Sequence, residues 1–320
     1  MSEEPLVRLS DRERDLLRSA CGEGSSPADW DDFNAAVCAA YVRVVRQLPR
    51  GVLEKIVSFG DIASEGYLVV RNLPIDKVLP PTPLRQTSAV LSEIPVATSV
   101  LLGIARTIGH PYTYRGEYDG SYLTSVLPTV DAVGSSSSHG AEDLPLHTET
   151  VHLYPYLPTA IGLLCLRSDP SRVARTTIVL ARDLVARCSA QLLLELRAAN
   201  FWVSVPQSFG MNRMAGGPTS VIEGPWDFPE IRLELSDMNP ITPGADRALG
   251  EVRTVAASCR REVFLRAGDL LLIDNRKVLH GRNRFPARLD GTDRWLLRAL
   301  VTTDLWPWRE HLSQGGPALF

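Results

Sequence analysis

The chain has 320 residues, of which 44% are hydrophobic and 22% are charged, and its formal net charge is −3. This apolar content supports a sizeable core and excludes wholesale disorder, while the small negative charge argues against a dedicated nucleic-acid-binding protein. No apolar run approaches the roughly 18 residues of a membrane-spanning helix, and the N-terminus is polar and acidic, unlike a signal peptide. We therefore expect a cytoplasmic protein with neither a nucleic-acid nor a membrane partner, and the sequence carries no signal of oligomeric state.

The first fifty residues are predicted to be largely helical. Ser10 and Glu13 have the spacing of a capping box, in which the two side chains satisfy free amides at the start of a helix. Residues 29–51 form an amphipathic run that stops at a proline and a glycine. A short β-branched stretch at 66–74 predicts a buried strand, and the pattern at 83–106 predicts another helix.

From residue 113 onwards the pattern changes to many short strands. Residues 113–128 alternate around Asp119-Gly120, which is a strong hairpin signal. Two helices are expected at 182–199 and 245–261. The other predicted strands cover 161–168, 176–181, 201–205, 229–235, 268–275 and 294–302. Because the strands do not alternate regularly with helices, they favour a sandwich or barrel, and the predicted fold class is mainly β with flanking helices.

We expect one domain over residues 1–320, since no linker divides the chain. N-terminal helices at 1–60 would pack against a β core at 61–305, followed by a tail at 306–320. The five cysteines are scattered and form no C-x-x-C pair, so neither a zinc cluster nor a disulfide framework is predicted.

Two histidines and one carboxylate have the composition of a metal site. His147 and Glu149 stand in the sequence Leu-His-Thr-Glu, and on a strand two residues with this spacing project from the same face. His280 follows the apolar strand predicted at 268–275. Two imidazoles and a carboxylate form the facial triad of non-haem Fe(II), which leaves coordination positions open. An H-x-E pair alone is common at structural or surface positions, so a further feature is needed to favour metal binding.

That further feature is Arg294, which lies fourteen residues after His280. A guanidinium binds a carboxylate through two parallel hydrogen bonds, as a dicarboxylate cosubstrate requires. With H-T-E, a late histidine and this arginine, the sequence from about residue 66 to 304 resembles the Fe(II)/2-oxoglutarate oxygenases of the clavaminate synthase type, which include asparagine oxygenase and the free arginine hydroxylases. Residues 290–298 are the most specific part of the likeness. The resemblance implies a double-stranded β-helix, or jelly roll.

The resemblance also implies roles for the residues of the centre. The iron ligands, and thus the catalytic centre, would be His147, Glu149 and His280. Arg294 would hold the C5 carboxylate of 2-oxoglutarate. A threonine on the strand after H-T-E would touch the same carboxylate; Thr177 fits best, with Thr176 as the alternative.

Three residues are expected at the substrate. Arg298, four residues beyond Arg294, would share its strand face and bind a substrate carboxylate. Tyr118 stands where relatives that act on free amino acids often carry glutamine. Glu234, within the strand predicted at 229–235, stands near the place of their acidic residues. These departures disfavour a free basic amino acid and leave open a capped or cyclised derivative, such as a cyclic dipeptide.

The implied reaction is hydroxylation of an unactivated C–H bond in an amino acid or an amino-acid-derived small molecule of secondary metabolism, for example in antibiotic biosynthesis. It would use Fe(II), 2-oxoglutarate and O2 and release succinate and CO2. Desaturation, epoxidation and cyclisation on the same scaffold are alternatives, whereas Glu149 disfavours halogenation because it fills the position that a halide needs. Two other classes are less favoured: a metal enzyme without 2-oxoglutarate would not need Arg294, and a jelly roll that only binds a small ligand would not need the triad.

Overall fold

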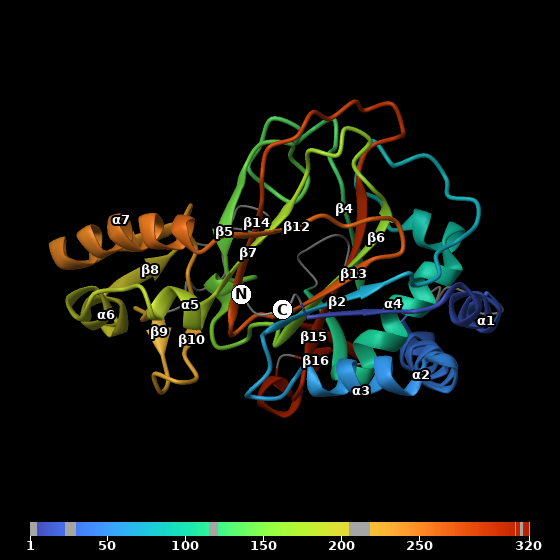
Figure 1. Cartoon of the computed structure of the whole chain (residues 1–320), viewed down its shortest axis with the longest axis horizontal. Coiled ribbons are helices and arrows are strands. Elements are labelled where there is room, and N and C mark those ends of the chain that lie inside the picture. The colour runs from blue at the N-terminus through green and yellow to red at the C-terminus, as the bar shows by residue number, and fades with distance from the viewer. Residues whose placement is uncertain are drawn as a thin grey trace.

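The computed structural model describes residues 5–22, 30–114, 121–204, 218–310, 312–313 and 316–319. Figure 1 shows two β-sheets that face one another, with the N-terminal helices outside one sheet and the later helices beside the other. The helices of this part of the chain are α1 (Asp11–Cys21), α2 (Trp30–Gln47), α3 (Arg50–Ser58), α4 (Pro95–Ile108), α5 (Ala181–Val185), α6 (Ala190–Arg197) and α7 (Pro243–Ser258), with 3-10 turns at Ala89–Glu93, Val151–Leu153 and Trp306–Trp308. None of the helices described is both long and apolar enough to span a membrane.

The larger sheet has the strand order β1-β2-β13-β6-β15-β3-β17-β16, and β4 also pairs with β15. Its strands are β1 (Leu6–Arg8), β2 (Tyr67–Arg71), β3 (His110–Tyr114), β4 (Leu123–Val126), β6 (Ala160–Arg167), β13 (Leu270–Asp274), β15 (Trp295–Thr302), β16 (Leu312–Ser313) and β17 (Gly316–Leu319). All its pairs are antiparallel except β1–β2 and β17–β3, so the first and the last described strands each have one parallel neighbour in this sheet.

The smaller sheet has the order β12-β7-β14-β5 and is antiparallel throughout. Its strands are β5 (Leu144–His147), β7 (Thr176–Leu180), β12 (Arg261–Val263) and β14 (Val278–Arg282). Two short antiparallel pairs lie beside it, formed by β8 (Phe201–Val203) with β11 (Met238–Pro240) and by β9 (Ile222–Glu223) with β10 (Glu230–Ile231). Residues of these pairs and of α5–α7 form one hydrophobic cluster against the outer face of the smaller sheet.

Both faces of the larger sheet are buried, which explains why its strands read as continuous apolar runs. In β13, Leu270 and Leu272 belong to the cluster under the N-terminal helices, in which α4 packs on β6 and β15. The alternate residues Leu271 and Ile273 belong to the cluster between the two sheets, together with Ile178 of the smaller sheet. The inner faces of the two sheets therefore enclose one core, and the candidate site residues lie at that core.

The capping box predicted at the start of the first helix is confirmed. Ser10 Oγ accepts a hydrogen bond from the Glu13 amide at 3.3 Å, and Glu13 Oε2 accepts one from the Ser10 amide at 2.7 Å. These bonds use two of the amides that a helix start leaves without internal partners.

The helix predicted at 83–106 begins later, at Pro95, after a separate 3-10 turn. The amides of Val96 and Ala97 donate to the Asp76 carboxylate at 3.1 and 3.0 Å. This cap comes from outside the predicted segment, so the local pattern could not reveal where the helix starts.

The helix predicted at 182–199 is two helices, α5 and α6. Ser189 lies between them and caps α6 by accepting a hydrogen bond from the Leu192 amide at 3.1 Å. A serine that accepts a backbone amide competes with helix continuation, and this explains the break. The strand predicted at 229–235 is likewise shorter, because only β10 is formed there.

The hairpin predicted at 113–128 is wrong for the residues that the structure describes. Its turn at Asp119-Gly120 lies outside them, and the strands on either side do not pair with each other. Instead β3 and β4 pair with successive stretches of β15. The two alternating stretches therefore form separate strands that pair one after the other along the central strand β15.

We expect opposite effects from alanine at two helical glycines. A Cβ at Gly103 would lie 2.5 Å from Val44 Cγ2 and 2.7 Å from the Ala40 carbonyl oxygen, where α2 and α4 touch. Gly103→Ala is expected to lower the free energy of unfolding by about 1–3 kcal/mol, because the helices must move apart. Gly250 of α7 has no atom within 4 Å of such a Cβ, so Gly250→Ala should raise it by about 0.5–1 kcal/mol. Denaturant unfolding measures both, and equal shifts would contradict the packing described.

Candidate metal centre

His147 and His280 lie opposite one another on neighbouring strands of the smaller sheet. β5 and β14 pair antiparallel with these two residues in register, and their ring centroids are 4.3 Å apart. On the other side of β14, Ile178 is in register with His280 and packs in the core between the sheets. Since opposed residues in an antiparallel pair project from the same face, both imidazoles point into the space between the sheets.

Glu149 reaches the histidines from a turn and not from a strand. β5 ends at His147, so the strand geometry predicted for this pair is wrong. The carboxylate nevertheless converges on the histidines: Glu149 Oε2 lies 3.8 Å from His280 Nε2. One ligand atom from each of the three residues lies within 4.8 Å of the other two. The structure therefore brings together the three residues that the sequence singles out.

The donor set fits one divalent iron ion. His147 Nδ1 lies 2.9 Å from the Pro145 carbonyl oxygen. Because a carbonyl only accepts, Nδ1 carries the proton and Nε2 keeps its lone pair for a metal. Glu149 and His280 are only 8% and 7% exposed. Two imidazoles and one carboxylate are the facial triad of non-haem iron, which leaves positions for further ligands.

The surroundings keep the buried groups in metal-binding protonation states. Burial lowers the pKa of His280 to about 3, and His147 acts in the same direction, so this imidazole is neutral at pH 7. Burial alone would raise the pKa of Glu149, but the charge of Arg298, with smaller effects of the two histidines, holds that pKa below its usual value. Glu149 is therefore an ionised carboxylate inside the core.

Arg298 forms an ion pair with the metal-binding carboxylate. Its Nη1 donates to Glu149 Oε2 at 3.0 Å, and both side chains are buried. Arg298 lies on the inner face of β15, between Leu296 and Leu300 of the core between the sheets. The sequence predicts a substrate carboxylate here and does not reveal the pair with Glu149. A guanidinium has five donors, so this pair uses only part of it.

Arg294, directly before β15, reaches across to the smaller sheet. Its Nη2 donates to Thr176 Oγ1 at 3.1 Å, and the residue is 6% exposed. Burial lowers the pKa of the guanidinium, while Cys165 and Asp169 oppose this effect. Within the described residues no carboxylate forms an ion pair with it. A buried cation in this setting suits an anionic ligand.

Thr176, and not Thr177, lies on the metal side of the smaller sheet. In β7, Ile178 is in register with His280, so residues at even positions of this strand share the face of the metal ligands. Thr177 is in register with Gly281 and belongs to the opposite face. Its buried hydroxyl has no hydrogen-bond partner among the described residues. The preference for Thr177 as the cosubstrate residue is thus corrected, because the sequence does not show which face of β7 is the inner one.

Glu234 lies beside the metal ligands, whereas the place of Tyr118 is outside the described residues. An antiparallel bridge joins Glu234 to His147, and the Ser236 amide donates to its carboxylate at 2.9 Å. Burial raises the pKa of Glu234 against the opposing effect of His147. No cationic side chain of the described residues forms an ion pair with it, so the carboxylate is available to a ligand.

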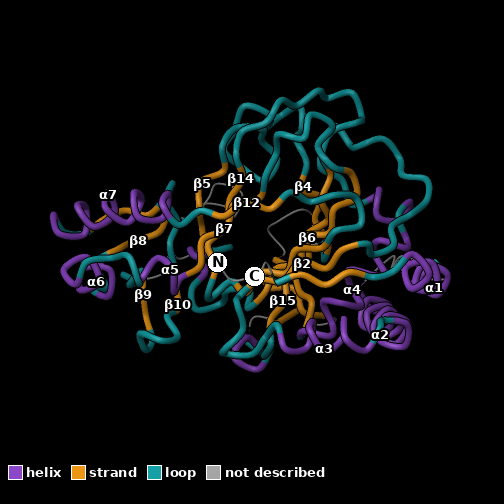
Figure 2. The backbone as a smooth tube through the Cα atoms, viewed as in Figure 1, coloured by secondary structure: helices purple, strands orange, loops and turns teal. Residues whose placement is uncertain are grey.

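Arg282 is a buried residue of the centre that the sequence analysis missed. It lies two residues after His280, and burial together with Arg294 lowers its pKa to about 9. Its Nη2 donates to the carbonyl groups of Glu142 at 2.7 Å and Ser137 at 3.3 Å. These bonds tie residues 137–142, which precede β5, to β14 at the end of the sheets where Figure 2 shows the long loops gathered. The sequence signal for Arg282 was its position two residues after the candidate metal ligand His280.

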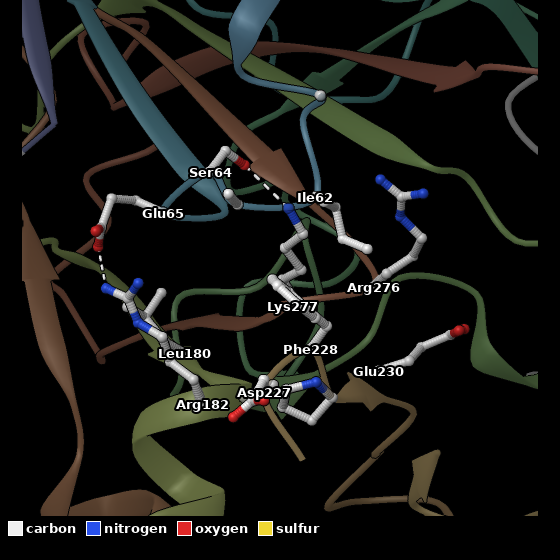
Figure 3. Close-up of a pocket in the computed structure, with 14 residues that line it drawn as sticks. Ile62, Ser64, Glu65, Leu180, Arg182, Asp227, Phe228, Glu230, Arg276 and Lys277 are labelled. Atoms are coloured by element: carbon white, nitrogen blue, oxygen red, sulfur yellow. Dashed lines mark hydrogen bonds and ion pairs between the residues drawn. The ribbon is translucent and has the colours of Figure 1, made fainter. Parts of the chain in front are cut away.

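A separate cavity of about 290 Å³ lies outside this cluster. It is lined by residues before β2, at the start of α5, before β10 and after β13, and includes none of the three candidate ligands. Figure 3 shows Arg182 bonded to Glu65 and Lys277 Nζ donating to Ser64 Oγ at 3.0 Å. Because it holds none of the three candidate ligands, it is a weaker candidate for the reaction than the centre between the sheets.

Comparison with known proteins agrees with this geometry. Residues 232–300 match the family described as "Taurine catabolism dioxygenase TauD, TfdA family". L-asparagine oxygenase of Streptomyces coelicolor is 33% identical over 77% of this chain and 73% of its own length. L-lysine 3-hydroxylase of Catenulispora acidiphila is 33% identical over 83% and 76%. The structure of asparagine oxygenase with Fe(II), 3-hydroxyasparagine and succinate superposes with a TM-score of 0.90 at 28% identity, covering 99% of both chains.

The facing sheets and the buried His-Glu-His cluster define a non-haem iron oxygenase. The sequence likeness makes this more specific: the chain belongs to the TauD, TfdA family of iron- and 2-oxoglutarate-dependent dioxygenases. The resemblance found from H-T-E, His280 and Arg294 is thereby confirmed.

We expect His280→Ala to weaken metal binding by more than about 100-fold, since even the loss of an outer-shell partner costs 10- to 100-fold. The measurement is an anaerobic titration of the apo protein with Fe(II). His110→Ala is the matched control, because His110 lies at the start of β3 and outside the cluster. Unchanged affinity in the His280 variant would contradict the assignment of the centre.

Proposed function

We propose that this enzyme hydroxylates C3 of a free L-amino acid with a polar side chain, in secondary metabolism, and releases succinate and CO2. One observation carries the proposal: the three candidate ligands and two buried arginines, Arg294 and Arg298, face the same space between the sheets. The position of attack is supported by two relatives, one a lysine 3-hydroxylase and one bound to 3-hydroxyasparagine.

His147, Glu149 and His280 would hold the iron. Together with 2-oxoglutarate and O2, the bound iron supplies the oxidising chemistry that inserts one oxygen atom into a C–H bond while 2-oxoglutarate becomes succinate and CO2. The chain's own contribution is to keep Glu149 ionised through Arg298, to keep His280 neutral through burial, and to enclose the reacting groups between two sheets that exclude water.

Arg294 and Thr176 would bind the C5 carboxylate of 2-oxoglutarate. The guanidinium can form two parallel hydrogen bonds to a carboxylate, and the threonine hydroxyl that it already contacts offers a further donor. Burial lowers the pKa of Arg294, and a bound anion would raise it again, because a nearby negative charge stabilises the charged guanidinium.

Arg298, Glu234 and Tyr118 are the proposed substrate residues. The Arg298 guanidinium, held beside Glu149, would bind the α-carboxylate, which places the amino acid against the metal centre. The Glu234 carboxylate beside His147 would accept hydrogen bonds from an amide or amino group of the substrate side chain. Tyr118 would complete the pocket.

We further propose that the two sheets are the halves of a double-stranded β-helix and that residues 1–320 form one catalytic domain. The pairing of β1 with β2 and of β17 with β3 supports this, because the first and the last described strands both join the larger sheet. We place the reaction in the cytoplasm, a location supported by five free cysteines in a chain without a described disulfide.

For the cosubstrate, Arg294→Leu should weaken 2-oxoglutarate binding by about 2–5 kcal/mol, the usual effect of removing one partner of a buried charge pair. Thr176→Val should weaken it by about 1 kcal/mol through the lost hydrogen bond, and Thr177→Val, its matched control on the other face, should leave it unchanged. Anaerobic titration of the Fe(II)-loaded enzyme with 2-oxoglutarate measures all three. Equal effects of the two threonine variants would show that Thr176 has no special role.

For the substrate, a succinate-release screen of free amino acids and cyclic dipeptides with mass spectrometry should find a polar amino acid that gains one oxygen atom at C3. Glu234→Gln should then raise KM for that substrate about tenfold, because a charged acceptor is replaced by a neutral one. Decay of 2-oxoglutarate without substrate should not change, since Glu234 does not touch the cosubstrate residues. If only cyclic dipeptides gave product, the proposal that the substrate is a free amino acid would be wrong.

A further inference from the structure

The turn that carries Glu149 has a conformation that needs support from outside. Thr150, the next residue, has a φ of +52°, in the left-handed region that β-branched residues rarely adopt. Such a backbone persists only where surrounding contacts hold it. Glu149 also lies beyond the end of β5, so strand pairing does not fix its backbone. Contacts from elsewhere in the chain must therefore place this carboxylate.

Asn275 supplies such contacts. Its Oδ1 accepts a hydrogen bond from the Glu149 amide at 2.8 Å, and its Nδ2 donates to the Glu149 carbonyl at 3.2 Å. The same Nδ2 donates to the Pro158 carbonyl at 3.0 Å. Asn275 is 1% exposed, so these bonds form where water does not compete.

We propose that Asn275 is a positioning residue for the metal centre. By bonding both the amide and the carbonyl of Glu149, its side chain takes the place of the neighbouring strand that this residue lacks. Asn275 contacts the backbone of Glu149 and not its carboxylate. It therefore acts by fixing the position of the Glu149 backbone, from which the side chain extends to the metal site. The proposal rests on the assignment of Glu149 as a metal ligand.

The segment that carries Asn275 is itself braced on its outer side. The Asp274 amide donates to the Gly66 carbonyl at 2.7 Å, and the Arg276 carbonyl accepts from the Ile231 amide at 2.8 Å. Lys277 Nζ donates to Ser64 Oγ at 3.0 Å, as Figure 3 shows at the cavity wall. Because the residues on both sides of Asn275 are held in this way, its side chain can hold the Glu149 turn and does not simply follow it.

The test compares Asn275→Ala with Asn283→Ala in the full-length apo protein. Asn283 is a matched control because its side chain also bonds backbone groups, those of Arg175 and Val173, but none of a metal ligand. Titration with Co(II), followed by the absorption of the bound ion, gives the dissociation constant. We expect Asn275→Ala to raise it by about 10- to 100-fold and Asn283→Ala by less than about twofold, even if both lower the melting temperature.

Glu149→Ala in the same titration separates this proposal from the metal assignment. If Glu149→Ala weakens Co(II) binding and Asn275→Ala does not, the positioning role is wrong and the metal site stands. If neither weakens it, the ligand assignment is wrong as well. Equal losses in the Asn275 and Asn283 variants would mean general destabilisation and would also overturn the proposal.

Hydrogen exchange of the wild-type apo protein tests the contact without any substitution. The Glu149 amide is expected to exchange as slowly as amides within the neighbouring strands, although it lies in a turn, because Asn275 holds it in the absence of metal. Rapid exchange, as in an exposed loop, would contradict the proposal even if Asn275→Ala failed to fold.

Discussion

The ion pair between Glu149 and Arg298 is the contact on which the centre depends. A buried carboxylate is strongly unfavourable unless a partner compensates its charge, and Arg298 does so at 3.0 Å. Arg298 belongs to β15 of the larger sheet, whereas Glu149 follows β5 of the smaller one. The same contact that keeps the metal ligand ionised therefore also joins the two sheets across their shared core, so the chemistry of the ligand and the spacing of the sheets are coupled.

The space between the sheets holds more positive than negative charge. Arg282, Arg294 and Arg298 are all buried there, and Glu149 is the carboxylate that pairs with one of them. Burial lowers the pKa of Arg282 and Arg294, which shows that their charge is unfavourable without a counter-ion. Such an arrangement does not serve stability. It matches instead the needs of a dicarboxylate cosubstrate and the carboxylate of an amino acid, whose binding would neutralise it.

The sequence predicted the composition of the centre better than its geometry. His147 and His280 follow from strand patterns and indeed lie opposite one another on neighbouring strands. For Glu149 the sequence pattern predicts a strand, whereas the structure has a turn. The pattern cannot show that Asn275, far along the chain, bonds the backbone of that turn. The choice between Thr176 and Thr177 failed for a similar reason, since alternation gives two faces but not which one is inside. In the fold, apolar runs located most strands, whereas the start of α4 depended on a cap from Asp76.

The residue between the first two ligands connects the metal centre to the segment that carries Glu234. The Thr148 amide donates to the Leu233 carbonyl at 2.7 Å, and its hydroxyl accepts from the Leu233 amide and donates to the Ile231 carbonyl, each at 3.1 Å. These bonds attach the ligand segment to the segment that ends in Glu234. Because Thr148 bonds only backbone groups of that segment, the side chains of the segment can change without loss of the attachment. Side chains beside the metal centre can thus vary while the ligand segment keeps its attachment to the rest of the chain.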